Sequence, residues 1–164
     1  MIFVILISIY LFFKPLDIKQ QNFVDVPLFE LKEFTMYELN TKGLQTIMIG
    51  SAATRYTNRY TIENMDYTDN EKEYIANMKA DHGIYKDDIV TLNGNIAYVR
   101  DDGVTFKTQK ALYNKKTSII TSDVGYVAYL NDSVVKGSYL KYNNNKNIIF
   151  SKNVQAKIQL QERK

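Results

Sequence analysis

The stretch IVTLNGNIAYVRDDGVTFKT, residues 89–108, decides the fold because it holds two glycine-centred turn signals only nine residues apart. Asn93-Gly94 between apolar residues is ordinarily the strongest short-range hairpin signal. A two-residue turn there would leave neither face of the hairpin uniformly apolar. A straight strand instead places alternate residues on one face, namely Val90, Leu92, Gly94, Ile96 and Tyr98. The pattern therefore predicts one strand over 89–100 and a turn only at Asp102-Gly103.

Gly94 is the unusual position on this strand, since it falls on the face that otherwise carries large apolar side chains. A glycine inside a strand marks a bulge, a bend or a close approach to the backbone. Two interpretations follow. Either the missing side chain leaves room for a bound guest, or the strand kinks there and needs a small residue.

Composition favours a β protein of about one domain's length. The 13 tyrosines and 8 phenylalanines, together with many Ile, Val and Thr residues, favour strands over helices. The chain has no cysteine, which excludes a disulfide scaffold, a thiolate zinc site and a catalytic cysteine.

The net charge of +3 conceals a basic C-terminal segment. Residues 1–132 carry 14 Lys and Arg against 17 Asp and Glu, whereas residues 133–164 carry 7 against 1. A basic segment suits anionic lipid headgroups, phosphates or an acidic partner. It also suits a solvated tail that is kept soluble by lysines.

The chain begins with an uncharged run, MIFVILISIYLFF, at residues 1–13. The run is shorter than the roughly 20 residues of a full membrane span. No basic region precedes it and no small-x-small cleavage site follows it. An uncleaved membrane-anchor helix therefore fits better than a signal peptide. Residues 14–34 are then a linker, and residues 35–164 form the folded domain.

Beyond the linker, apolar and polar residues alternate with period two between turn signals. The expected strands are 35–40, 44–50, 55–67, 73–85, 89–100, 104–113, 118–130, 133–142 and 147–160. Segment 70–82 also suits a helix capped by Gly83. The alternation of Tyr74, Ala76 and Met78 favours the strand.

An internal repeat supports the strands. Three segments begin with a tyrosine, spaced by 28 and 29 residues, and reach a small residue nine positions later. The tyrosines are Tyr85, Tyr113 and Tyr142, and the small residues are Gly94, Ser122 and Ser151. Each unit reads as a strand, a polar turn and a longer strand kinked at the small residue. Stacked units of this kind make a β-sandwich or a jelly roll.

The segment ADHGIYKDDIVTLNGNIAYVRDDGVTFKTQKALYNKKTSIITSD resembles the lipopolysaccharide-transport β-jellyroll proteins. An Ala-Asp start, a Gly-Asn-Ile/Val step, an Asp-Gly turn and a Tyr-Asn-x-x-Thr turn recur in that group. The resemblance covers roughly residues 80–124. Together with the expected anchor, it is closest in type to the LptC family, whose members have a single inner-membrane span.

This resemblance implies an all-β chain, a β-jellyroll or open β-sandwich preceded by one N-terminal membrane-anchor helix. It implies a single-pass inner-membrane protein with its C-terminal domain in the periplasm. The protein would accept lipopolysaccharide from an inner-membrane ABC-type transporter driven by ATP and pass it to a periplasmic jelly-roll bridge protein. No reaction is catalysed and no cofactor is implied.

The alternation of side chains along the strands and the internal repeat predict which residues bind the lipid and which bind the partner proteins. The lipid-binding residues are Leu92, Gly94, Ile96, Tyr98, Phe106, Tyr113, Val124 and Tyr142. Strand 147–160 is expected to be an open edge that docks the next jelly roll by strand addition. Its apolar face is Val154, Ala156, Ile158 and Leu160. By the same logic the transporter docks at the N-terminal edge near residues 35–50.

Other functions have weaker support in the sequence. His82 has no recognisable nucleophile partner, and the pairs Asp87-Asp88 and Asp101-Asp102 suit turns better than acid–base catalysis. No metal-ligand spacing or phosphate-binding glycine loop occurs, and aromatic residues on strands are more typical of a core than of a nucleic-acid platform. The remaining alternative is an anchored envelope scaffold that binds proteins through its sheet edges and carries no lipid.

Overall fold

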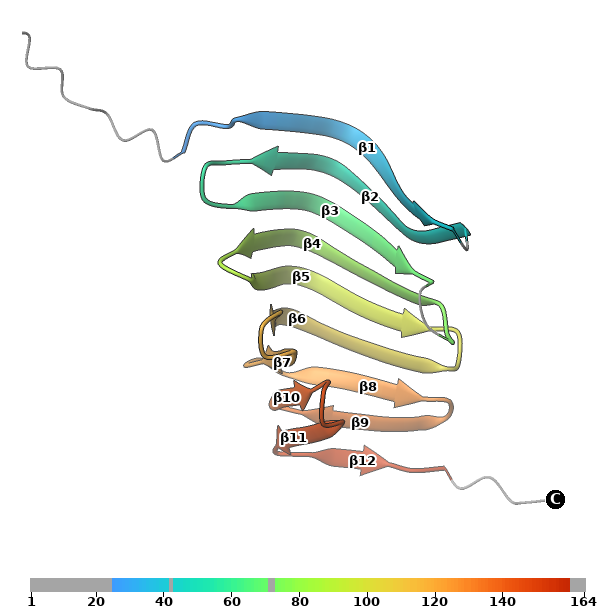
Figure 1. Ribbon diagram of the computed structural model, residues 1–164. Coiled ribbons are helices and arrows are strands. Elements are labelled where there is room, and N and C mark those ends of the chain that lie inside the picture. The colour runs from blue at the N-terminus through green and yellow to red at the C-terminus, as the bar shows by residue number, and fades with distance from the viewer. Residues whose placement is uncertain (1–24, 42, 71–72, 160–164) are drawn as a thin grey trace, which may run out of the picture.

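The computed structural model describes residues 25–41, 43–70 and 73–159, and every regular element in this part is a β-strand (Figure 1). The strands are β1 (Phe29–Asn40), β2 (Gly43–Arg55), β3 (Tyr60–Asp69), β4 (Ala76–Lys86), β5 (Ile89–Arg100), β6 (Val104–Asn114), β7 (Ile119–Ser122), β8 (Tyr126–Leu130), β9 (Ser133–Gly137), β10 (Tyr139–Asn143), β11 (Ile148–Lys152) and β12 (Gln155–Lys157). The expected all-β fold is confirmed. The anchor helix expected at residues 1–13 lies outside the described residues.

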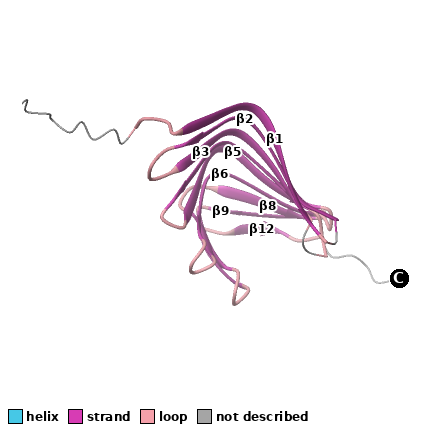
Figure 2. Ribbon diagram, turned by 45° about the horizontal axis from the view of Figure 1, so that its top comes forward, coloured by secondary structure: helices cyan, strands magenta, loops and turns pink. Residues whose placement is uncertain are grey.

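One antiparallel sheet contains all the strands, and it forks at β6. Strands β1 to β6 pair in chain order. Residues 104–108 of β6 then pair with β8, while residues 112–114 pair with β7. One arm continues as β7-β10-β11 and the other as β8-β9-β12. Figure 2 shows the strands bending midway and the sheet opening into two diverging arms, an open sheet consistent with a β-jellyroll.

The core lies on one face of the bend, which we call the inner face. Its buried cluster consists of Met65, Ala80, Leu92 and Ile96. Half-buried apolar side chains pack around it, namely Ile62, Tyr67, Met78, Val90 and Ala111. The cluster is small, so most of the apolar inner face outside it keeps some contact with solvent.

Strand β5 runs through Asn93-Gly94 without reversing, as the phase of its side chains predicts. The chain forms a β-bulge there, since Gly94 and Asn95 lie opposite the single residue Gln109 of β6. Both bulge residues have positive φ, +76° and +45°. The space beside Gly94 is taken by the carboxyl group of Asp81, which accepts a hydrogen bond of 2.8 Å from Asn95 Nδ2. The structure thus favours the kink over a cavity at this glycine.

Several strand boundaries differ from the expected ones in the first half of the chain. Segment 76–86 is the strand β4, so the strand interpretation there is confirmed over the helix. Strand β1 begins at Phe29, inside the expected linker, and β2 continues to Arg55. The expected strand 55–67 instead begins with a hairpin turn at 56–59, closed by a 2.8 Å bond from Tyr56 N to Arg59 O. The polar run there favours a turn, and the alternation resumes at Tyr60.

The three long strands expected near the C-terminus are each two shorter strands, so these predictions are wrong. Segment 118–130 divides into β7 and β8, 133–142 into β9 and β10, and 147–160 into β11 and β12. Each division carries the chain from one arm to the other. At two of the crossings a small residue stands where no space is left for a larger one. Ser122 is 1% exposed, and a Cβ at Gly137 would collide with the Tyr126 ring.

Candidate functional site: the inner face of the sheet

An apolar row crosses the whole sheet on its inner face, from β1 to β12. Residues that pair directly across antiparallel strands share a face, and Tyr67 and Met78 of this row pack on the core. The row, which we call the central row, consists of Met36, Met48, Tyr67, Met78, Tyr98, Phe106, Ala128, Val135 and Ala156. It contains no charged residue.

A second row of the inner face continues into the other arm and is rich in tyrosine. We call it the tyrosine row; it consists of Tyr60, Tyr85, Val90, Tyr113, Ile120, Tyr142 and Ile149. The three repeated tyrosines of the sequence therefore share one row. The ring centroids of Tyr60 and Tyr85 are 6.2 Å apart. The repeat thus adds hairpins that extend one apolar surface.

The middle of the central row is half-buried. Tyr67, Met78, Tyr98 and Phe106 each keep partial exposure. The rings of Phe106 and Tyr126 stack at 5.5 Å. Burial raises the pKa of Tyr98 to about 12, so its hydroxyl stays neutral at physiological pH. This continuous, uncharged and partly open surface suits flexible apolar chains, which gain free energy by leaving water.

The structure places most of the predicted lipid-binding residues on this face. Tyr98 and Phe106 lie in the central row, and Tyr113 and Tyr142 lie in the tyrosine row. Leu92 and Ile96 are more deeply buried, at 5% and 3% exposure, and lie on the same face of β5 between the two rows.

The other two predicted residues lie elsewhere. Gly94 forms the bulge against Asp81, and Val124 lies in the crossing between β7 and β8. Sequence reasoning did not include Met36, Met48, Tyr67 or Met78 among the site residues. Their alternation was visible, but the strand register that joins them was not.

The sheet has open edges at both ends. Within the described residues, β1 pairs only with β2, β11 only with β10 and β12 only with β9. Large apolar side chains are exposed there, including Leu39 at 71%, Ile149 at 66% and Ile158 at 69%. The described residues thus leave the C-terminal end of the sheet unpaired, although two short strands make this edge instead of the one long strand that the sequence predicts.

The predicted docking residues are divided between these short strands and their flanks. Ala156 lies in β12, Val154 precedes that strand and Ile158 follows it. Leu160 lies outside the described residues. At the other end, only β1 is an edge, and residues 46–49 of the expected N-terminal edge pair with both β1 and β3.

The carboxylate pairs and the histidine have structural partners. Asp87 and Asp88 form the β4–β5 turn with φ of +50° and +63°, and Asp102 pairs with Arg100 beside the β5–β6 turn. His82 Nδ1 contacts the Glu63 carboxylate on the exposed outer face. The described residues include no group of three or more side chains that could hold a metal ion.

The chain matches the model of a known protein family. The model of the family described as "LptC: Lipopolysaccharide-assembly, LptC-related" matches residues 1–159. The chain belongs to the LptC family. No curated protein matches the chain. The LptC family acts in lipopolysaccharide transport across the envelope together with partner Lpt proteins, and it is a family of bridge components and not of enzymes.

Membership of the LptC family confirms the resemblance seen in the sequence. In the part of the chain that the structure describes, no helix has the length and apolar character needed to cross a membrane.

Proposed function

We propose that this LptC-family chain carries the acyl chains of lipopolysaccharide along the inner face of its sheet. The observation that carries the proposal is the central row, which crosses every strand from β1 to β6 and continues through β8, β9 and β12 without a charged side chain. Acyl chains on this row would leave water while the saccharide stays solvated. The buried side chains of Leu92 and Ile96 would continue the apolar surface beside the row.

The proposal includes both neighbours of the chain in the pathway. The lipid arrives from the inner-membrane ABC-type transporter at the β1 edge and leaves to the periplasmic jelly-roll bridge protein at the β11 and β12 edges. Open strand edges bind partners by main-chain hydrogen bonds, and the exposed apolar residues there would continue the row across each junction. The run at residues 1–13 would anchor the chain in the inner membrane, with the sheet in the periplasm. Directional movement must come from the transporter, because a passive surface only equilibrates its ligand.

Lipid co-purification from cells that make lipopolysaccharide tests this function with a matched pair of variants. Ala128 and Val127 are neighbours in β8 on opposite faces, and Ala128 belongs to the central row. Full-length wild-type protein should retain lipopolysaccharide through purification. Ala128→Asp places a charge in the row and should reduce the retained lipid several-fold, whereas Val127→Asp should not.

Mass spectrometry of the bound lipid gives the result, and thermal unfolding shows whether both variants fold. Equal lipid in the two folded variants would remove the central row from the lipid path. The anchored scaffold is the second candidate, because the edges themselves are exposed and apolar. It predicts that the protein binds its partners and retains no lipopolysaccharide.

A further inference from the structure

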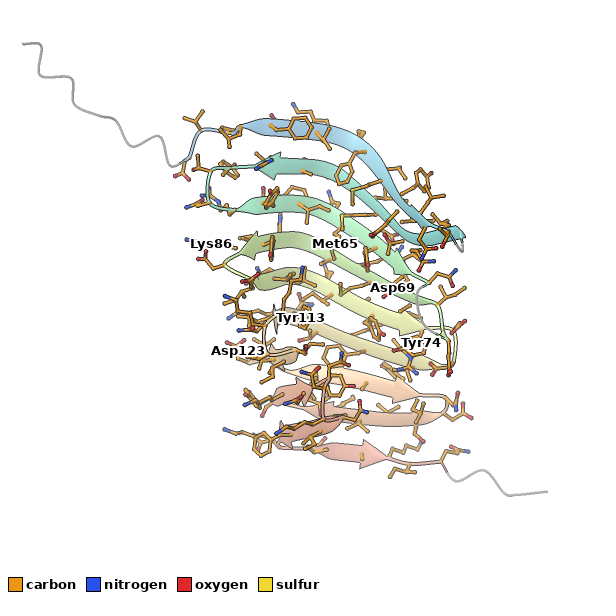
Figure 3. The ribbon with its side chains drawn as sticks, in the orientation of Figure 1. Met65, Asp69, Tyr74, Lys86, Tyr113 and Asp123 are labelled. Carbon is orange, nitrogen blue, oxygen red and sulfur yellow. The ribbon has the colours of Figure 1, made fainter. Side chains whose placement is uncertain are left out.

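The turns at the two ends of the strands carry opposite charge. The turns after β2, β4, β6 and β10 form what we call the basic rim, with Arg55, Arg59, Lys86, Lys115, Lys116 and Lys146 against Asp87 and Asp88. The described residues of the turns after β1, β3, β5 and β8 form the acidic rim, with Asp69, Glu73, Asp101, Asp102 and Asp132 against Arg100. Figure 3 shows Lys86 at one end of the strands and Asp69 and Tyr74 at the other, with Met65 between them.

Backbone hydrogen bonds join three neighbouring turns of the basic rim, those after β4, β6 and β10. Lys115 N donates to Asp88 O at 2.9 Å, and Asn144 N donates to Ser118 O at 3.0 Å. The basic side chains of successive hairpins therefore stand beside one another along one side of the sheet. Such an alignment concentrates positive potential along that side.

Part of this positive charge is uncompensated. Arg59 pairs with Asp25 at 2.7 Å, and Lys116 pairs with Asp88 at 3.0 Å. Arg55 and Lys86 form no salt bridge with a carboxylate of the described residues. Arg55 instead lies over the Tyr60 ring at 5.4 Å, and Lys115 Nζ lies 5.3 Å from the centre of the Tyr85 ring.

A cavity of about 290 Å³ opens at this rim, between the β2–β3 and β4–β5 turns. Its lining includes cationic, aromatic and amide or hydroxyl groups, with one carboxylate: Arg55, Tyr56, Thr57, Asn58, Arg59, Tyr60, Tyr85, Lys86 and Asp87. One arginine guanidinium group can donate two parallel hydrogen bonds to the oxygens of a phosphate, and a lysine ammonium group adds a positive charge. The chemistry of the cavity therefore suits a phosphate group.

The tyrosine row borders this rim, and Arg55 of the rim pairs directly with Tyr60 of the row. Tyr85 donates its hydroxyl hydrogen bond to Asp88 at 3.2 Å, and Tyr142 donates to Asn147 at 3.1 Å. These hydroxyls thus face the turns while the rings belong to the inner face. Tyrosine commonly takes this position where an apolar region meets water, as at membrane surfaces. The row marks the boundary between the apolar and the polar parts of the groove.

We propose that the basic rim binds the phosphate groups of the cargo's headgroup, with the cavity at Arg55 and Lys86 as its main site. This assignment rests on the proposed function and adds the orientation of the lipid. The acyl chains lie on the central row, the headgroup passes the tyrosine row, and its phosphates lie toward the basic rim. The acidic rim repels them from the opposite side.

Binding of lipopolysaccharide to the full chain in detergent tests this orientation, with two lipid forms and two variants. The lipid is used with its phosphates intact or after phosphatase treatment. Arg55→Gln/Lys86→Gln removes two charges from the rim. Lys107→Gln/Lys136→Gln is the matched control, because it removes two charges from exposed lysines on the outer face.

The rim variant should weaken binding of the phosphorylated lipid by on the order of tenfold and leave the dephosphorylated lipid unaffected, while the control changes neither. If wild-type protein binds both lipid forms equally, or if the rim variant weakens both equally, the rim assignment is wrong and the proposed function stands. If wild-type protein binds neither form, the proposed function fails and the rim assignment falls with it. A separate titration with inorganic phosphate, followed by ³¹P NMR, covers the other source of phosphate. Saturable phosphate binding that depends on the rim, with lipid affinity unchanged in the variant, would assign the rim to free phosphate and overturn the proposal.

Discussion

At the scale of single residues, the bulge of β5 depends on the contact between Gly94 and Asp81. A side chain at position 94 would meet the Asp81 carboxyl group and would have to adopt a φ of +76°. Asn95, the next residue, tolerates its own positive φ because asparagine enters the left-handed region more readily than most residues. Its amide group then holds Asp81 in place at 2.8 Å. Three adjoining residues therefore specify one bulge.

Gly94→Ala should lower the free energy of unfolding by about 1–3 kcal/mol, because it adds both backbone strain and a steric collision. Asp81→Ala alone should cost about 0.5–1.5 kcal/mol through the lost hydrogen bond. In the Asp81→Ala background the cost of Gly94→Ala should fall by about 1 kcal/mol, since the contacts with the Asp81 carboxyl group are gone while the close contact with the Cβ of residue 81 and the strain remain. Chemical denaturation of the four proteins measures the coupling. If the double variant loses the sum of the two single free-energy changes, then Asp81 does not restrict the side chain at position 94.

At the scale of elements, the alternation of apolar and polar residues predicted strands well only where the chain does not cross from one arm of the sheet to the other. The expected strands 89–100 and 104–113 correspond closely to β5 and β6. The expected strand 118–130 failed because its alternation continues through Ser122 and Gly125, where the chain crosses to the other arm. A local pattern cannot reveal a change of pairing partner. Of the three repeated small residues, Gly94 lies in the bulge of β5 and Ser122 ends β7 at a crossing, whereas Ser151 pairs regularly with Leu140 inside β11, so the predicted kink is absent there.

Strand β12 is the element whose removal tests the docking edge. It pairs only with β9 in the described part of the chain, so deletion of residues 154–164 should leave the rest of the sheet folded. The truncated protein should bind the periplasmic jelly-roll partner at least tenfold more weakly, because the main-chain donors and acceptors of the edge are lost. Its contact with the inner-membrane transporter should persist, since that contact is assigned to β1. Unchanged affinity for the periplasmic partner would exclude β12 as the docking strand.

At the scale of the whole molecule, the fork at β6 turns one sheet into two arms with a shared apolar inner face. The sequence repeat predicted that Tyr85, Tyr113 and Tyr142 are equivalent, and the tyrosine row confirms it. The fork could not be predicted, because it requires the two halves of one strand to pair with different partners. The central row was missed for a related reason. Its members come from nine strands. They form one row only because of the register of each pair of neighbouring strands, which the sequence does not reveal.

The central claim is that the lipid lies on the inner face, and a photocrosslinking pair in β5 tests it most directly. Tyr98 lies in the central row, whereas Val99 is the next residue, points to the opposite face and is 42% exposed. A photoreactive amino acid replaces each residue in turn in the full chain, in cells that make lipopolysaccharide. Our account predicts a lipopolysaccharide adduct from position 98 and none from position 99. Equal labelling at the two positions, or labelling from position 99 alone, would contradict it.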